Sequence, residues 1–165
     1  MRCLIENIIQ QLEEVQKGKL WIGSTFSSAF SQLDEYSVFV RPLEDMHSVA
    51  EIISHLTLWR KETLLKIKTG QGSKTDECAE NWLSNEKLRI LGWDRIRSEY
   101  ERTLSELIGL LKSKDDDFLD EHYYDTDFKG NYPYRFVIEG MLHHDLYHLG
   151  QLGLIMKYLK KTENQ

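Results

Sequence analysis

The sequence predicts an all-α protein, a four-helix bundle with one short extra helix and long connections. Three observations support this. Long segments carry apolar residues at helical spacing, only two prolines occur among the 165 residues, and no segment shows the alternating pattern or Asn-Gly turn of a β-hairpin. Four long helices that each have one apolar face can bury those faces against one another in a bundle.

The first long helix is expected over residues 4–17, where it ends at Gly18. Its apolar side is formed by Leu4, Ile5, Ile8, Ile9, Leu12 and Val15. A short helix is expected over residues 24–36, because apolar side chains recur there every three or four positions. It should end before Pro42, since a residue that precedes proline is disfavoured in the helical conformation.

The second long helix is expected over residues 48–68, ahead of the glycines at positions 70 and 72. Ser48 and Glu51 have the spacing of a capping box, in which each side chain binds the backbone N–H of the other residue. This helix therefore has a well-defined start.

The third long helix is expected over residues 84–112, with a bend near Gly92. Its apolar side includes Leu88, Leu91, Trp93, Ile96, Tyr100, Leu104 and Leu107. A loop over residues 115–131 should lead to the fourth long helix, which begins at Pro133 and runs to about residue 160. The connections are long and rich in Trp and Tyr, so they could line a pocket.

Composition narrows the classes of function. The length suits one domain over residues 1–165, and the net charge of −6 argues against nucleic-acid binding, which depends on Lys and Arg facing phosphates. No run of eighteen apolar residues occurs and charges appear early, so we expect no membrane span and a cytoplasmic location. In such a reducing compartment Cys3 and Cys78 should be free thiols.

The most informative motif is the pair His144 and His148 in the fourth long helix. Residues four apart point the same way, and both imidazoles fall within the apolar face of that helix. A buried imidazole without a partner costs about 1–3 kcal/mol, so a shared metal ion would explain the pair. Core histidines that bind backbone groups or water remain an equally good explanation of the pair alone.

His55 lies at the edge of the apolar face of the second long helix, from which it can reach a neighbouring helix. Two ligands from one helix and one from another would give three histidines with a fourth position open, as in catalytic zinc sites. His47 is off the apolar face, so a role at the helix start or on the surface is expected. His122 should be a solvated loop residue.

The chain resembles the DinB/YfiT-like superfamily of small bacterial four-helix bundles over nearly its whole length. The matching pieces are WIGS (21–24), RPLEDMHSV (41–49), HLTLWR (55–60), Trp82, Trp93 and HDLYHLGQ (144–151). The resemblance implies that His55, His144 and His148 bind a divalent metal, usually zinc or nickel, in a pocket at one end of the bundle. It also implies a homodimer.

The resemblance further implies a thiol transferase or isomerase, in which a low-molecular-weight thiol binds the metal and attacks a small electrophilic molecule. Gln151, on the face of the two C-terminal histidines, and Tyr147 are then candidates to orient the ligands or the bound cofactor, and core packing explains both equally well. Two alternatives remain. One is a non-catalytic interaction module stabilised by metal, and the other is a hydrolase, for which Glu51 is the only evident base.

Overall fold

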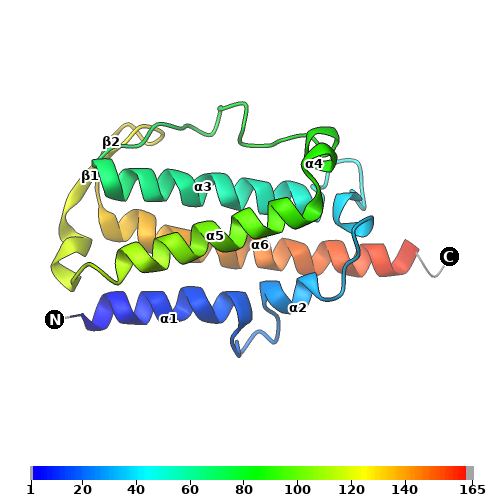
Figure 1. Cartoon of the computed structure of the whole chain (residues 1–165), viewed down its shortest axis with the longest axis horizontal. Coiled ribbons are helices and arrows are strands. Elements are labelled where there is room, and N and C mark those ends of the chain that lie inside the picture. Colours follow the sequence, from blue (N-terminus) through cyan, green and yellow to red (C-terminus); the bar gives the residue numbers. More distant parts are fainter. Residues whose placement is uncertain (1, 163–165) are drawn as a thin grey trace.

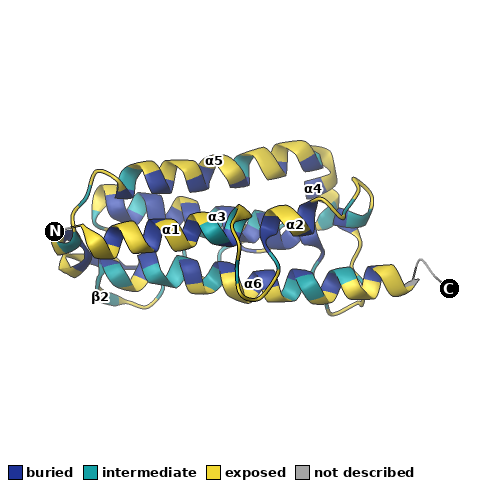
Figure 2. Cartoon of the chain, turned by 90° about the horizontal axis from the view of Figure 1, so that it is seen from below, coloured by how far each residue is buried: buried dark blue, intermediate teal, exposed yellow. Residues whose placement is uncertain are grey.

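The computed structural model describes residues 2–162 and confirms the predicted helical bundle. Its four principal helices are α1 (Cys3–Lys17), α3 (Val49–Thr69), α5 (Trp93–Leu111) and α6 (Tyr134–Thr162), and they lie side by side along the long axis of the molecule (Figure 1). Their buried faces turn toward one another and their exposed faces toward solvent (Figure 2). Burial of these apolar faces is what holds the four helices together.

The order of the helices requires one long return of the chain. α1 and α6 run in one direction, whereas α3 and α5 run in the other (Figure 1). Because α3 and α5 are parallel and pack against each other, the chain after α3 must travel back along the bundle before α5 can begin. Residues 70–84 make this return alongside α3, and the short helix α4 (Asn85–Leu91) follows. The return brings loop residues beside the middle of the bundle.

The short predicted helix over residues 24–36 is wrong in extent. The structure has a single helical turn, α2 (Phe26–Phe30), and then a 3-10 turn, η1 (Ser37–Phe39). Asp34 explains the interruption, because its carboxylate accepts the backbone N–H groups of Tyr36 at 2.8 Å and Ser37 at 2.7 Å. These bonds offer the backbone a local alternative to helical pairing.

Gly92 divides the third predicted helix into α4 and α5 instead of bending it. Its φ of 81° lies in the region that favours glycine, and its ψ of 149° is far from helical. Leu91, just before the break, is exposed, as is Leu4 near the start of α1, although both were expected on apolar faces. Helix ends leave such side chains beyond the reach of the neighbouring helices.

The predicted loop over residues 115–131 contains a 3-10 turn and an antiparallel hairpin, which the absence of strand signals did not indicate. The turn is η2 (Asp116–Asp120), and the strands are β1 (His122–Asp125) and β2 (Gly130–Pro133). The Asp125 carboxylate closes the hairpin by accepting the N–H groups of Asp127 at 3.0 Å and Phe128 at 3.1 Å. The hairpin lies at the end of the bundle where α3 finishes and α6 begins (Figure 1).

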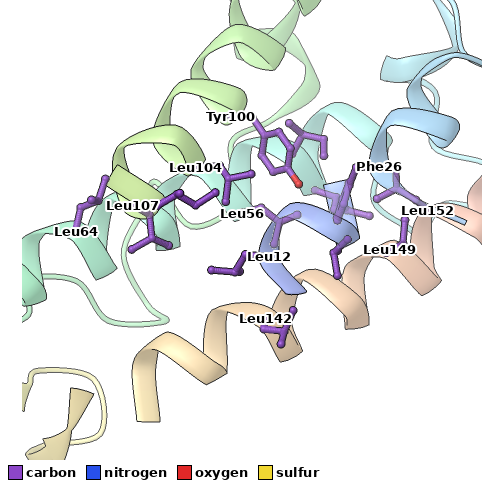
Figure 3. Packing of buried hydrophobic residues seen from close by; sticks show 14 of the residues in the cluster. Leu12, Phe26, Leu56, Leu64, Tyr100, Leu104, Leu107, Leu142, Leu149 and Leu152 are labelled. Carbon is purple, nitrogen blue, oxygen red and sulfur yellow. The ribbon is translucent and has the colours of Figure 1, made fainter. Parts of the chain in front are cut away.

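Apolar side chains from all four long helices meet in one core (Figure 3). Leu12 of α1, Leu56 of α3, Leu107 of α5 and Leu152 of α6 are among its fully buried members. None of the helices in residues 2–162 is both long enough and apolar enough to cross a membrane.

A buried polar network crosses this core and joins the same four helices. Arg60 of α3 donates to the Asp145 carboxylate of α6 at 2.6 Å and to the Tyr100 hydroxyl of α5 at 3.0 Å. Tyr100 in turn donates to Gln16 of α1 at 2.8 Å, and Gln16 donates to Asp145 at 3.2 Å. Asp145 directly follows His144, so the network fixes α6 next to one of the predicted metal ligands.

Candidate metal centre

The structure brings His55, His144 and His148 together. His144 Nε2 lies 3.0 Å from His55 Nε2 and 3.0 Å from His148 Nε2. Among residues 2–162 this is the one group of His, Cys, Asp or Glu side chains that gathers three potential ligand atoms within 4.8 Å of one another. The cluster lies beside the middle of α6, whereas the resemblance implied a pocket at an end of the bundle.

Two of the imidazoles are oriented by hydrogen bonds from their other nitrogen. His55 Nδ1 donates to the main-chain oxygen of Asn81 at 3.2 Å, and His148 Nδ1 donates to Oε1 of Gln151 at 2.7 Å. A carbonyl oxygen can only accept, so each Nδ1 carries the proton and each neutral ring presents a lone pair at Nε2. Both lone pairs point toward His144.

This arrangement favours a bound cation. A neutral His144 can donate at most one proton from Nε2, so at least one lone pair in the cluster faces another nitrogen without a proton between them. Three neutral imidazoles with a fourth position open form a donor set that divalent zinc, nickel and related ions accept. The residues present therefore fit a divalent metal.

Burial keeps these imidazoles neutral at physiological pH. Desolvation, reinforced by the neighbouring histidines, lowers the pKa of His144 to about 3. Desolvation likewise lowers the pKa of His148 to about 4 and also lowers the pKa of His55. Metal ligation requires the unprotonated ring, so the cluster is ready to bind a cation without first losing protons.

Aromatic rings enclose His55. Trp82 is sandwiched between His55, with ring centroids 4.0 Å apart, and His47, with centroids 3.7 Å apart. The Trp59 ring meets the His55 ring edge-on, with ring centroids 6.3 Å apart. His47 was expected only to start a helix or face solvent, and its stacking on Trp82 has no periodic signal in the sequence because both residues lie outside the long helices.

A cavity of about 510 Å³ extends from the cluster toward the hairpin. His55 and His144 border one end of it, and Trp59 and Phe136 belong to its apolar walls. Lys66, Tyr123 and Asp125 line the cavity at the hairpin. The Asp125 carboxylate accepts hydrogen bonds from Lys66 at 2.8 Å and from the Tyr123 hydroxyl at 2.9 Å. A small molecule in this cavity could reach the histidines.

The remaining predicted site residues occupy different places. Gln151 orients His148 through the hydrogen bond to its Nδ1. Tyr147 is 64% exposed, and its ring meets the His148 ring edge-on, with ring centroids 5.0 Å apart. Glu51 forms the predicted capping box with Ser48, and its carboxylate also accepts from Arg41 Nε at 2.9 Å. Its oxygens are thus occupied at the helix start, and it does not border the cavity beside the cluster.

The fold and the site together define a four-helix bundle with three converging imidazoles beside a cavity. Residues 21–152 match the model of the DinB superfamily, and the chain belongs to that superfamily.

Two solved structures have the same fold. The DinB-like protein YjoA from Bacillus subtilis has a TM-score of 0.63 at 14% identity, over 93% of this chain and 92% of that protein. YfiT from Bacillus subtilis, described as a probable metal-dependent hydrolase with an unusual four-helix bundle topology, has a TM-score of 0.62 at 12% identity, over 94% of this chain and 87% of YfiT. Among curated proteins, no match to this sequence was found.

Proposed function

We propose that this protein is a divalent-metal-dependent enzyme that transfers a low-molecular-weight thiol to a small electrophile. The observation that carries the proposal is the convergence of three Nε2 atoms, two of which belong to side chains, His55 and His144, that border a cavity of about 510 Å³. Membership of the DinB superfamily supports a metal site, and zinc or nickel is the ion we expect.

His55, His144 and His148 would hold the metal, while Gln151 keeps His148 in the required tautomer. A divalent metal held there would lower the pKa of a bound thiol and would so supply a nucleophile near neutral pH. The apolar walls that include Trp59 and Phe136 would hold the electrophile and exclude water. The transfer forms a bond from the thiol sulfur to an electrophilic carbon, expels a leaving group such as chloride, and releases the thiol proton to solvent.

Hydrolysis is the second candidate. The structural neighbour YfiT is described as a probable metal-dependent hydrolase, and the carboxylates of Asp76, Asp127 and Glu139 border the cavity, where one of them could accept a proton from water. Glu51, the base suggested by the sequence, is bound by Arg41 and Ser48. Thiol transfer ranks first because it requires no general base beside the cluster.

A paired assay separates the two reactions. Zinc-loaded and nickel-loaded protein is given free cysteine with chlorodinitrobenzene, and separately nitrophenyl acetate in water, with His148→Ala as the matched variant. We expect thioether formation that needs the thiol and is abolished by His148→Ala and by a chelator. Metal-dependent ester cleavage without thioether formation would instead establish hydrolysis and overturn the proposed transfer.

A further inference from the structure

We propose that Asn81 is a positioning residue that sets the orientation of His55 for metal binding. The inference rests on the metal site proposed above. Asn81 lies on the return segment between α3 and α4, is 7% exposed, and makes four hydrogen bonds, two of them to α3. Nothing in the sequence pattern pointed to it, because the return segment has no helical or strand periodicity.

The main-chain oxygen of Asn81 determines which His55 nitrogen faces the cluster. It accepts from His55 Nδ1 at 3.2 Å, so Nε2 is left unprotonated and points at His144. Without this acceptor the ring could carry its proton on Nε2, and that tautomer cannot ligate through Nε2.

The side chain of Asn81 holds that oxygen in place. Its Oδ1 accepts from Trp59 Nε1 at 2.9 Å, and its Nδ2 donates to the main-chain oxygen of Asp76 at 2.8 Å. Trp59 lies one helical turn after His55 on α3, so the two bonds from α3 to Asn81 come from neighbouring points of one rigid element. The acceptor is thereby fixed relative to the ligand that it orients.

The residue after Asn81 restricts the same ring in a second way. The Trp82 ring lies almost parallel to the His55 ring, at an interplanar angle of 5°. The His47 ring covers the other face of Trp82, at an interplanar angle of 3°. Stacking opposes tilting of the imidazole, and the bond to Asn81 opposes its rotation. The two neighbours together hold one orientation of His55.

Further bonds tie the return segment to the rest of the protein. The buried Glu62 carboxylate of α3 accepts the Ser73 hydroxyl at 2.9 Å and the Lys74 N–H at 3.0 Å. Asp127 of the hairpin accepts the Asp76 N–H at 2.8 Å. Ser73, Lys74, Asp76 and Asn81 thus each fix the return segment by hydrogen bonds. Of these four residues, Asn81 is the one that binds a predicted metal ligand.

The first test is zinc affinity, measured by competition with a chromophoric chelator. Asn81→Ala should weaken zinc binding about 10- to 100-fold, the effect typical of losing a group that orients a ligand. Asn131→Ala, which removes an exposed amide on β2, is the matched control and should leave the affinity unchanged. Trp59→Phe keeps an aromatic ring but removes the donor to Asn81, so it should weaken binding in the same direction even if Asn81→Ala does not fold.

The second test separates orientation from a general loss of structure. In the zinc-loaded protein, the Nδ1–H protons of His55 and His148 are followed by NMR, with His55→Ala used to assign the first. Asn81→Ala and Trp59→Phe should each speed the exchange of the His55 Nδ1 proton with solvent. The His148 Nδ1 proton, which is held by Gln151, should stay protected. Two results would overturn the positioning role but not the proposed function. One is that the variants speed exchange equally at His55 and His148, and the other is that the zinc affinity of both Asn81→Ala and Trp59→Phe stays within about twofold of wild type. Wild-type protein that binds no zinc and no nickel would overturn the proposed function as well.

Discussion

Replacing Asp145 with Asn should strongly destabilise the protein, because it removes the charged partner of a buried arginine. Arg60 and Asp145 are each 1% exposed, and their atoms meet at 2.6 Å. The other bonds of Arg60 go to the hydroxyl and main-chain oxygen of Tyr100, at 3.0 and 3.3 Å, and neither carries a full charge. In residues 2–162, Arg60 Nε has no hydrogen-bond partner. Asp145→Asn would therefore leave a guanidinium in the core without a counter-charge.

The expected loss is about 3–5 kcal/mol in the free energy of unfolding, the range for breaking a buried ion pair. For a chain of this size that corresponds to a fall in Tm of roughly 6–20 °C. The assay is urea and thermal unfolding followed by circular dichroism, in the presence of chelator so that metal binding adds nothing to stability.

Lys61 of α3 and Glu99 of α5 form an ion pair on the surface, and this pair provides the control. Their side chains are 48% and 33% exposed and meet at 2.6 Å, so Glu99→Gln should cost less than about 1 kcal/mol. The double variant Arg60→Met with Asp145→Leu should be more stable than Asp145→Asn, because no charge remains in the core. If Asp145→Asn were as stable as Glu99→Gln, the charge of Asp145 would not be what stabilises the buried Arg60.

Two further predictions concern pH and helix capping. In chelated protein, burial holds the pKa of His144 at about 3 and that of His148 at about 4, below the unfolded value of about 6.5, so the unfolded chain binds more protons at intermediate pH. The stability that the two neutral rings contribute should therefore be full above pH 6.5 and be lost toward pH 4, at on the order of 1 kcal/mol per pH unit for each ring. Urea unfolding that is flat between about pH 6.5 and 5 would contradict this. Ser48→Ala should lower the free energy of unfolding by about 1 kcal/mol, because it removes the acceptor for the Glu51 N–H, and a difference below about 0.3 kcal/mol in urea would show that the cap is dispensable.

The parts of the fold and site that follow a helical period could be predicted from the sequence. His144 and His148 share a face with Val137 and Leu152, and the structure has both imidazoles on that face. His55 lies at the edge of the α3 face, and it is the ligand that reaches α6. In each case the side-chain direction follows from the backbone spacing alone.

The parts that depend on loop paths could not be predicted in this way. Asn81 and Trp82 meet His55 only because the chain returns alongside α3, and local sequence does not determine the path of such a segment. The hairpin was missed for a related reason, because Asp125 closes it through a turn longer than the two-residue Asn-Gly type.

The most direct test of the proposed metal centre is the zinc and nickel content of untagged protein, by elemental analysis. Wild-type protein is compared with His148→Ala, which removes one imidazole of the cluster, and with His122→Ala, which removes an exposed histidine on β1. We expect about one equivalent of metal in wild type and His122→Ala, and its loss from a His148→Ala variant that remains folded. Wild-type protein without metal after growth in supplemented medium, or equal metal in all three, would contradict the three-histidine site.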